Sequence, residues 1–272
     1  MSGKIVSWPF FSLCTFALNT KHMIAFITGA TSGFGRAIAL KFAEHGWNII
    51  IAGRREERLE ELQHIILDTY DVKVYTISFD VRNRKQVEEE LEALPHAWKE
   101  IDVLVNNAGL AAGFATINEG NIDDWEQMID TNVKGLLYVS RVVTPWMVHR
   151  KKGHVINIGS TAGKDAYAYG NVYCATKFAV DALSKSMRID LLPHGIKVTS
   201  VNPGAAETEF SLVRFKGDAE KAKNVYKGFD PLQAEDIAEI VWFAASRPHH
   251  VGINDITVTP LAQANALYIH KS

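Results

Sequence analysis

The stretch that decides the fold is MIAFITGATSGFGRAIALKFAEH, residues 23–45. Its apolar start, Met23–Thr28, predicts a buried strand, and Gly33–His45 predicts a helix. The same alternation continues along the chain, with strands expected at 48–52, 72–79, 102–105, 154–158, 197–201 and 255–259 and helices at 56–69, 85–94, 123–150, 172–192 and 234–246. Apolar strands that alternate with helices indicate a parallel sheet covered on both faces. We therefore expect a single α/β domain over residues 23–272, built on a doubly wound parallel sheet.

A glycine-rich turn joins the first strand to the first helix. Its spacing is Gly-x-x-x-Gly-x-Gly, which differs from the Gly-x-Gly-x-x-Gly of typical dinucleotide-binding folds. The glycines permit a tight turn, and the helix N-terminus behind it offers unpaired N–H groups and a favourable dipole to a pyrophosphate. Doubly wound sheets bind ligands at the carboxyl ends of their strands, where this turn lies. The residues expected to contact a dinucleotide here are Gly29, Thr31, Ser32, Gly33, Phe34 and Gly35.

Two arginines follow the second strand, where the two nicotinamide cofactors are usually distinguished. An acidic residue at this place accepts a hydrogen bond from the ribose 2′-hydroxyl of NAD, whereas an arginine accommodates a 2′-phosphate. Here the strand runs into Arg54 and Arg55, with no acid before Glu56. Guanidinium groups match a phosphate in charge and in donor geometry, so we predict NADP as the cofactor. The alternative is that both arginines only begin a solvated helix face.

Two further strand ends complete the expected cofactor site. Asp80 and Val81 follow the third strand, where the adenine belongs, and the Asp80 carboxylate is a candidate acceptor for the adenine amino group. The alternative role of Asp80 is to cap the helical segment that starts at Asn83. Small and amide residues after the fourth strand let the chain bend beneath the cofactor. They are Asn107, Ala108 and Gly109.

Four polar residues from three parts of the chain form the candidate catalytic set. Tyr173 and Lys177 are four positions apart on one predicted helix and so share a face. Ser160 follows a predicted strand, and Asn132 lies within a long predicted helix. Each residue alone has an ordinary structural explanation: Tyr173 as a surface aromatic, Lys177 as a solvated charge, Ser160 as a turn residue and Asn132 as a capping or core amide. Their joint occurrence in these elements favours a catalytic role.

These four residues supply what the reduction of a carbonyl requires, a proton at the oxygen while a hydride goes to the carbon. Tyr173 is the expected proton donor, and since a tyrosine has a reference pKa of about 10, we expect the ammonium of Lys177 to lower it. Lys177 is also placed to bond the nicotinamide ribose. Ser160 is expected to hold the substrate oxygen, and Asn132 to order a water that links Lys177 to solvent.

Composition limits the classes of function. The 272 residues carry a net charge of −2 and are 47% hydrophobic and 22% charged, so nothing indicates a nucleic-acid-binding or membrane surface. Two cysteines without a metal-binding spacing indicate a reducing compartment, and we expect a cytoplasmic protein without a metal site.

The N-terminal residues do not match the alternating pattern. The apolar stretch Trp8–Leu18 follows Lys4 but has no small-residue cleavage site after it. It is too short to span a bilayer, which takes about 20 residues. We expect residues 1–22 to be a leader ahead of an original start at Met23, and the alternative is an anchor for a membrane or a partner.

The motifs together resemble those of the short-chain dehydrogenase/reductase superfamily, whose fold is Rossmann-like. The matching residues are Thr28–Gly35, Asn106–Gly109, Asn132, Ser160, Tyr173, Lys177, Pro203, Gly204 and Thr208. The resemblance implies a tyrosine acid/base, a serine substrate anchor, a lysine on the cofactor ribose and an asparagine water relay. It also implies that the segment 203–211 wraps the nicotinamide end, with Pro203, Gly204 and Thr208 on the cofactor, and that the protein is a homotetramer.

A narrower resemblance rests on longer runs of sequence. IDTNVKG (129–135), NIGSTAG (157–163), GNVY (170–173) and TEFSLVRFKGD (208–218) are similar to the NADP-dependent 3-hydroxy acid dehydrogenases, a group that includes serine and L-allo-threonine dehydrogenases. This resemblance implies oxidation of the 3-hydroxyl of a small 3-hydroxy acid. The chain departs from that group in its leader and in the run 205–207, AAE, and the second departure bears on substrate preference.

A 3-hydroxy acid brings a carboxylate close to the reacting carbon. Burying that anion without a partner is costly, so a cation is expected beside it. The segment after Thr208 carries Arg214 and Lys216, and arginine is the better candidate because its planar fork matches a carboxylate. The alternative is that Arg214 lies on a solvated helix face and pairs with an acid such as Asp218.

Two other functions stay open from the sequence. A broad-specificity NADPH carbonyl or diketone reductase would use the same residues on a wider range of substrates. A cofactor-binding sensor without turnover belongs to another class, and the intact catalytic set argues against it because a sensor needs no proton relay. The fold alone does not decide between these functions.

Overall fold

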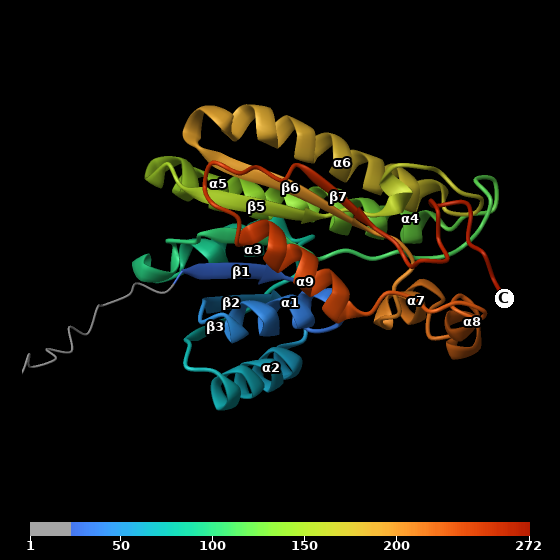
Figure 1. Cartoon of the computed structure of the whole chain (residues 1–272), viewed down its shortest axis with the longest axis horizontal. Helices are drawn as coiled ribbons and strands as arrows, with labels where there is room; N and C mark the ends of the chain where they lie inside the picture. Colours follow the sequence, from blue (N-terminus) through green and yellow to red (C-terminus); the bar gives the residue numbers. More distant parts are fainter. Residues whose placement is uncertain (1–22) are drawn as a thin grey trace, which may run out of the picture.

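The computed structural model describes residues 23–272, and the expected leader, residues 1–22, lies outside the described residues. Within the described range seven strands form one sheet in the order β3-β2-β1-β4-β5-β6-β7, and each neighbouring pair is parallel (Figure 1). The predicted doubly wound α/β fold is confirmed. The strands are β1 (Ile24–Thr28), β2 (Asn48–Gly53), β3 (Val74–Ser78), β4 (Val103–Asn106), β5 (Gly153–Ile158), β6 (Ile196–Pro203) and β7 (Asp255–Val258).

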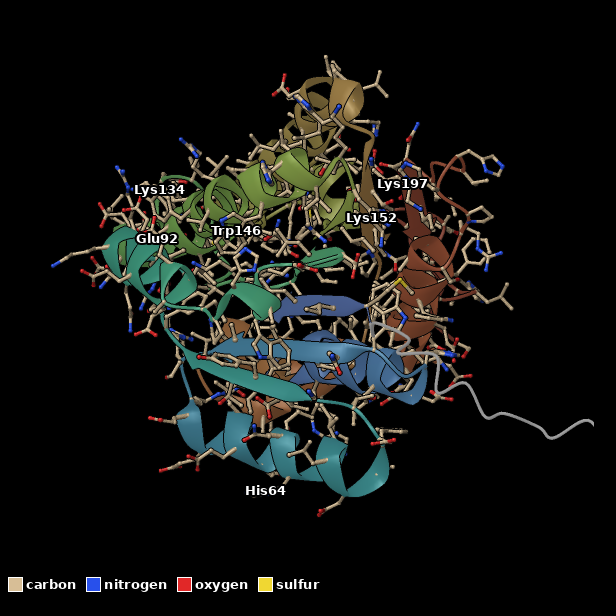
Figure 2. The ribbon with its side chains drawn as sticks, turned by 90° about the vertical axis from the view of Figure 1, so that its left-hand side faces the viewer. His64, Glu92, Lys134, Trp146, Lys152 and Lys197 are labelled. Carbon is tan, nitrogen blue, oxygen red and sulfur yellow. The ribbon has the colours of Figure 1, made fainter. Side chains whose placement is uncertain are left out.

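Helices cover both faces of this sheet. One face packs against α1, α2 and α9, which bury Phe42, Leu62 and Val241 against the strands. The other face packs against α3 and α5 and the end of α6. His64 of α2 and Trp146 of α5 accordingly lie on opposite sides of the sheet (Figure 2). The helices are α1 (Gly33–Glu44), α2 (Glu56–Thr69), α3 (Arg84–Glu92), α4 (Ile122–Ile129), α5 (Leu136–Arg150), α6 (Asn171–Leu191), α7 (Glu209–Arg214), α8 (Ala219–Asn224) and α9 (Ala234–Ala245).

The strand order reverses between β1 and β4. β2 and β3 extend the sheet on one side of β1, whereas β5, β6 and β7 extend it beyond β4 on the other. The connections therefore leave the carboxyl ends of the strands in opposite directions, and a crevice for a ligand opens between them. The short helices α7 and α8 lie at this end of the sheet (Figure 1). Figure 2 shows the opposite side of the molecule, where Lys152 and Lys197 lie near the starts of β5 and β6.

Three elements differ from the expected ones. The helix predicted at 123–150 is two helices, α4 and α5, joined by a π-helical turn over Asp130–Gly135. The strand predicted at 197–201 continues to Pro203, because its end pairs with β7. The segment after Thr208, for which no element was predicted and which is here called the lid, contains two short helices, α7 and α8; the side chains of Thr208 and Asp218 cap N–H groups at their starts.

Between residues 23 and 272, no helix combines the length and the apolar character needed to cross a membrane.

Candidate active site

A cavity of about 440 Å³ opens at the carboxyl ends of the strands. That volume is within the usual range for a small-molecule or cofactor site. Of the candidate site residues, only Gly35 and Asn132 do not line it. The candidates that do are Gly29, Thr31, Ser32, Gly33, Phe34, Arg54, Arg55, Asp80, Val81, Asn107, Ala108, Gly109, Ser160, Tyr173, Lys177, Pro203, Gly204, Thr208 and Arg214.

The glycine-rich turn packs directly against the end of β4. The amide of Asn107 donates to the backbone oxygens of Thr28 at 2.9 Å and Gly29 at 3.1 Å. A side chain at Gly35 would collide with the Gly29 carbonyl and with the Asn107 amide. Gly29 itself has φ of +66°, in the left-handed region that favours glycine. Gly35 therefore allows the turn to pack closely against β4 on the side away from the cavity, and the other side of the turn faces the cavity.

Arg55 lies over the glycine-rich turn. Its Nη2 donates to Thr31 Oγ1 at 2.8 Å and to Ser32 Oγ at 3.1 Å, while its Nη1 lies 3.4 Å from Glu209. Arg54 is more exposed, and its Nη1 is 3.9 Å from a carboxylate oxygen of Asp80. The two arginines thus line the far end of the cavity, at the place where the sequence predicts the 2′-phosphate.

Asp80 does not cap the helix that follows it. The side chain of Asn83 does so, by accepting from the N–H of Gln86, and the alternative proposed for Asp80 is wrong. Both Asp80 carboxylate oxygens accept from Arg82, at 2.6 to 3.1 Å. Partial burial opposes ionisation of this carboxyl group, but the hydrogen bonds from Arg82 prevail and hold its pKa below the usual range. Asp80 is therefore an anion at the cavity wall.

Tyr173, Lys177 and Ser160 meet at the other end of the cavity, and all three are at least nine-tenths buried. Tyr173 and Lys177 lie on one face of α6, with Lys177 Nζ 5.9 Å from the centre of the Tyr173 ring. The Ser160 side chain is hydrogen-bonded to the Tyr173 hydroxyl. The structure therefore brings together three of the four predicted catalytic side chains.

The pKa of Tyr173 departs from expectation. Burial raises it above its ordinary value, the neighbouring Tyr167 adds to this, and the hydrogen bond to Ser160 opposes it only in part. The expected lowering by Lys177 is wrong, because burial of the hydroxyl dominates its pKa; the Lys177 Nζ lies 5.9 Å from the ring centre and donates to the Ile158 carbonyl at 2.9 Å. Burial in turn lowers the pKa of Lys177 to about 8. Tyr173 is thus held in its protonated form, as a proton donor requires.

Asn132 has a different set of contacts from the one expected. It lies in the π-helical turn, and its side chain exchanges two hydrogen bonds of 2.8 Å with the backbone of Leu110. Its amide also donates to Thr176 Oγ1 at 3.0 Å. The amide group is therefore occupied in holding the loop after β4 beside Gly109, which lies next to Lys177. Its side chain acts on the site through this loop.

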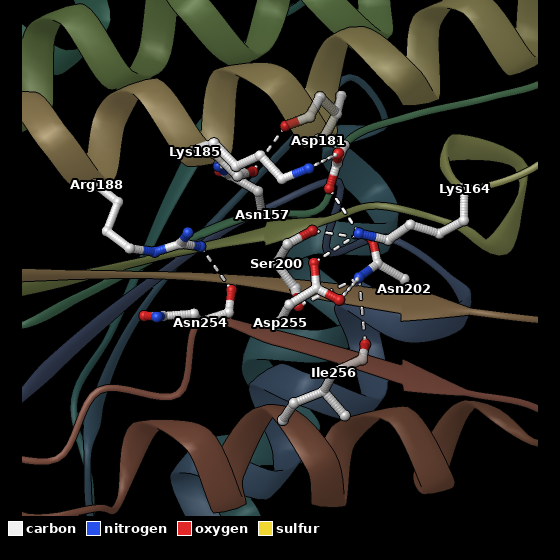
Figure 3. Close-up of polar contacts among 12 residues, drawn as sticks. Asn157, Lys164, Asp181, Lys185, Arg188, Ser200, Asn202, Asn254, Asp255 and Ile256 are labelled. Carbon is white, nitrogen blue, oxygen red and sulfur yellow. Dashed lines mark hydrogen bonds and ion pairs between the residues drawn. The ribbon is translucent and has the colours of Figure 1, made fainter.

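A charged network fixes the loop that carries Ser160. Lys164 lies just after this loop, and its Nζ bonds Asp181 at 2.6 Å and Asp255 at 2.7 Å (Figure 3). Asp181 is one turn beyond Lys177 in α6, and Asp255 begins β7. Lys164 therefore ties the serine loop to the helix that carries Tyr173 and to the last strand of the sheet.

Arg214 ends α7 and points into the cavity. The centre of its guanidinium lies 4.8 Å from the Phe114 ring, 5.5 Å from Tyr167 and 5.8 Å from Tyr173. Its Nη1 donates to the Tyr167 hydroxyl at 3.1 Å. Its Nε and Nη2 are buried and have no hydrogen-bond partner among the described residues. The alternative pairing with Asp218 is wrong, because Asp218 pairs with Lys221 instead.

Several cavity residues were not predicted from the sequence. Tyr167 and Phe210 line the catalytic end, and Phe114 stacks on Arg214 beside them. Phe114 and Tyr167 belong to no motif or periodic pattern in the sequence. Phe210 lies within the run 208–218 that resembles the 3-hydroxy acid dehydrogenases, but that resemblance did not single it out as a site residue.

The arrangement of a glycine-rich turn, a buried Tyr-Lys pair and a serine at the ends of parallel strands defines a nicotinamide-dependent oxidoreductase site. Residues 23–218 match the family model for short chain dehydrogenase. The chain belongs to the short-chain dehydrogenase family.

Known proteins of the family show how far the likeness extends. The chain is 50% identical to the NADP-dependent 3-hydroxy acid dehydrogenase of Salmonella typhi over 252 residues, which are 92% of this chain and all of that protein. It is 43% identical to serine 3-dehydrogenase of Agrobacterium fabrum over 88% of this chain and 94% of that one. The closed form of a serine dehydrogenase complexed with NADP+ has a TM-score of 0.86 at 47% identity, covering 92% of this chain and 100% of that one.

Proposed function

We propose that this protein is an NADP-dependent dehydrogenase that transfers a hydride between the nicotinamide and the 3-hydroxyl carbon of a small 3-hydroxy acid such as serine. The observation that carries this proposal is the buried guanidinium of Arg214, which has two unpartnered donors beside the Tyr173 ring. A buried cation with free donors needs an anion, and a substrate carboxylate supplies one. The similar dehydrogenases named above act on such acids according to their names.

The residues of the cavity fit NADP. Its wall runs from Arg54 and Arg55, through the glycine-rich turn, to Tyr173 and Lys177. The backbone of the turn leaves no room for side chains on its packed side and offers a helix N-terminus toward the cavity. Two guanidinium groups at the far end suit a 2′-phosphate, and we assign Arg54 and Arg55 to it.

The other cofactor contacts follow from position along the same wall. Asp80 and Val81 lie at the adenine end of the proposed site, and Asn107, Ala108 and Gly109 lie beneath its middle. Thr208 lies over Gly33, because a side chain at Gly33 would touch the Thr208 methyl and hydroxyl groups. We therefore assign these residues, together with Pro203 and Gly204, to cofactor binding.

The residues of the chain divide the reaction among them. The bound nicotinamide supplies or accepts the hydride. The Tyr173 hydroxyl exchanges a proton with the substrate oxygen, and the Ser160 hydroxyl holds that oxygen in place. Lys177 holds the nicotinamide ribose and exchanges protons with Tyr173. Asn132 is assigned to the same relay as a positioning residue, because its side chain holds the loop next to Lys177.

The two alternative functions use part of the same site. A broad carbonyl or diketone reductase would need the hydride and proton chemistry without an anion receptor, so Arg214 argues for the narrower substrate class. A sensor without turnover would have no use for a buried Tyr173 that is hydrogen-bonded to Ser160. We retain the reductase as the second candidate because the aromatic rings of Phe210 and Tyr167 line the catalytic end of the cavity.

We also propose that the protein acts in the cytoplasm as a homotetramer. The low cysteine content supports the compartment, and Cys174 is a free, buried thiol. Exposed apolar side chains support the assembly. They include Phe178 and Ile189 of α6, which are 43% and 73% exposed, and Phe243 of α9 and Leu261 after β7.

Replacement of Arg214 by leucine tests the proposed substrate class. Hydrogen bonds to a charged group contribute about 1.5–3 kcal/mol, so kcat/KM for serine or 3-hydroxybutyrate is expected to fall by roughly 10- to 100-fold. An uncharged alcohol of similar size is expected to change little. Steady-state rates with both substrates, in parallel with Arg214→Lys, make the measurement. Arg214→Lys keeps the positive charge without the planar guanidinium, so its kcat/KM for the acid is expected to fall less than that of Arg214→Leu.

The control for this prediction is Lys221→Leu, which removes an exposed cation from the neighbouring helix α8 and is expected to leave both rates unchanged. Equal losses on charged and uncharged substrates would assign Arg214 to the packing of the lid. No loss on either substrate would remove Arg214 from the site and with it the main support for a 3-hydroxy acid.

A further inference from the structure

Glu209 places an anion on the arginines at the far end of the cavity. Its carboxylate oxygens lie 2.8 and 3.0 Å from Nη1 of Arg58, and one lies 3.4 Å from Nη1 of Arg55. Hydrogen bonds from Arg58 prevail over partial burial and keep the pKa of Glu209 low, so the group is ionised at neutral pH. Glu209 is the first residue of α7, more than 150 positions away from both arginines in the chain. An acidic residue stabilises the start of a helix, which accounts for an acid at the first position of α7. It does not account for the contacts of Glu209 with Arg55, the N-cap of α2, and with Arg58 in the first turn of α2.

The donors of Arg55 are divided between two partners. Nε and Nη2 bond Thr31 and Ser32 of the glycine-rich turn, which leaves Nη1 toward Glu209. A phosphate that approaches Nη1 therefore meets a carboxylate already in place. Two anions on the same guanidinium repel each other, so a phosphate and Glu209 each bind Arg55 more weakly when both are present.

The lid helix connects this contact to the catalytic end. α7 has Glu209 at its first position and Arg214 at its last. The Arg214 carbonyl accepts from Gly113, and its side chain lies on Phe114 and Tyr167. The same short helix therefore touches the arginines at one end of the cavity and the proposed carboxylate site at the other.

We propose that Glu209 is a resident counter-anion of the 2′-phosphate subsite: it competes with the 2′-phosphate of NADP for Arg55 and Arg58, and phosphate binding releases the start of α7. Arg58 is thereby a third cation of this subsite. The inference rests on the proposed assignment of Arg55 to the 2′-phosphate. NAD has no 2′-phosphate and leaves the contact of Glu209 with Arg55 and Arg58 intact. Glu209 therefore couples the identity of the bound cofactor to the mobility of α7.

The test is the binding of two adenosine ligands, adenosine 2′,5′-bisphosphate and adenosine 5′-monophosphate, to the wild-type chain and its variants. Glu209→Gln keeps the size of the side chain and removes the competing charge. It is expected to raise the affinity for the bisphosphate by roughly 1.5- to 5-fold, the range for exposed ion pairs, and to leave the affinity for the monophosphate unchanged. Titrations by calorimetry at one fixed ionic strength give both affinities, since salt screens exposed charges.

Three variants separate the possible outcomes. Glu220→Gln removes an exposed acid from the first turn of α8, and it is expected to change neither affinity. Arg58→Gln is expected to lower the affinity for the bisphosphate and to leave the affinity for the monophosphate unchanged. Arg55→Gln tests the underlying assignment, and if it leaves the preference for the bisphosphate unchanged, the 2′-phosphate site proposed above is wrong. The proposed competition is wrong if Arg55→Gln lowers the affinity for the bisphosphate but Glu209→Gln lowers it as well or leaves it unchanged. The assignment of Arg55 to the 2′-phosphate would stand in that case.

Amide hydrogen exchange gives a readout without turnover. In the wild-type chain the bisphosphate is expected to speed exchange over residues 209–214, because it frees the start of α7, while the monophosphate does not. In Glu209→Gln this segment is expected to exchange fast before any ligand is added. Slower exchange in the wild-type chain with the bisphosphate would overturn the proposed release.

Discussion

Replacing Tyr173 by phenylalanine is expected to lower kcat by about 100- to 10,000-fold, the usual contribution of general acid–base catalysis. The change keeps the ring that packs 5.6 Å from Phe210 and deletes only the hydroxyl beside Ser160. Burial keeps the pKa of this hydroxyl high, so it is protonated and ready to donate when the carbonyl is reduced. No other hydroxyl is proposed to exchange a proton with the substrate. Initial rates with saturating NADP or NADPH measure the loss.

The binding of cofactor to the Tyr173→Phe variant serves as the control. The ring stays in place, so the affinity for NADPH and the thermal stability are expected to stay close to those of the wild-type protein. A variant that binds cofactor normally and turns over at a near-normal rate would contradict the assignment of Tyr173. A variant that loses cofactor binding along with activity would point to a structural role for the hydroxyl.

Replacing Arg54 and Arg55 together by alanine is expected to raise KM for NADP by roughly 10-fold or more and to change KM for NAD little. Each charged hydrogen bond to a 2′-phosphate contributes about 1.5–3 kcal/mol, and NAD has no group at that position. The geometry supports a larger share for Arg55, which is fixed by Thr31 and Ser32, than for the more exposed Arg54. Initial rates as a function of each cofactor make the comparison.

A matched control is Arg84→Ala, which removes an arginine whose partner is Glu88 on the same helix, α3. It is expected to change neither constant, because an exposed ion pair between neighbouring turns contributes little. A wild-type enzyme that prefers NAD would refute the cofactor assignment before any variant is made. An equal rise of both constants in the double variant would mean that the arginines support the turn and do not select the cofactor.

The sheet could be predicted because its signals are local. The strands β1, β2 and β4 are mostly apolar runs of four to six residues, and Gly46 and Gly195 end their helices in the left-handed conformation that glycine favours. The proximity of Tyr173 and Lys177 could also be predicted, since residues four positions apart share a helix face whatever the tertiary structure. The position of the arginines after β2 followed from the strand boundary alone.

The remaining features depend on contacts between distant segments. The contact of Glu209 with Arg58 joins residues 151 positions apart, and no local pattern indicates it. The pKa of Tyr173 depends on its burial and on Tyr167, which comes from a loop. The π-helical turn carries Asn132, whose side chain bonds Leu110 from 22 positions earlier in the chain. Such features follow from tertiary packing, which sequence patterns do not contain.

The measurement that tests the proposed function most directly is the substrate preference of the wild-type protein with NADP. The panel consists of L-serine, L-allo-threonine and 3-hydroxybutyrate, each compared with an uncharged alcohol of similar size, and of small diketones in the direction of reduction with NADPH. At least one 3-hydroxy acid is expected to exceed its uncharged counterpart in kcat/KM by roughly 10-fold or more, the contribution of one charged hydrogen-bonded pair at the site of Arg214. Faster turnover of uncharged alcohols or diketones than of every acid would contradict the proposal in favour of a carbonyl reductase, and the absence of turnover on the whole panel would favour a sensor.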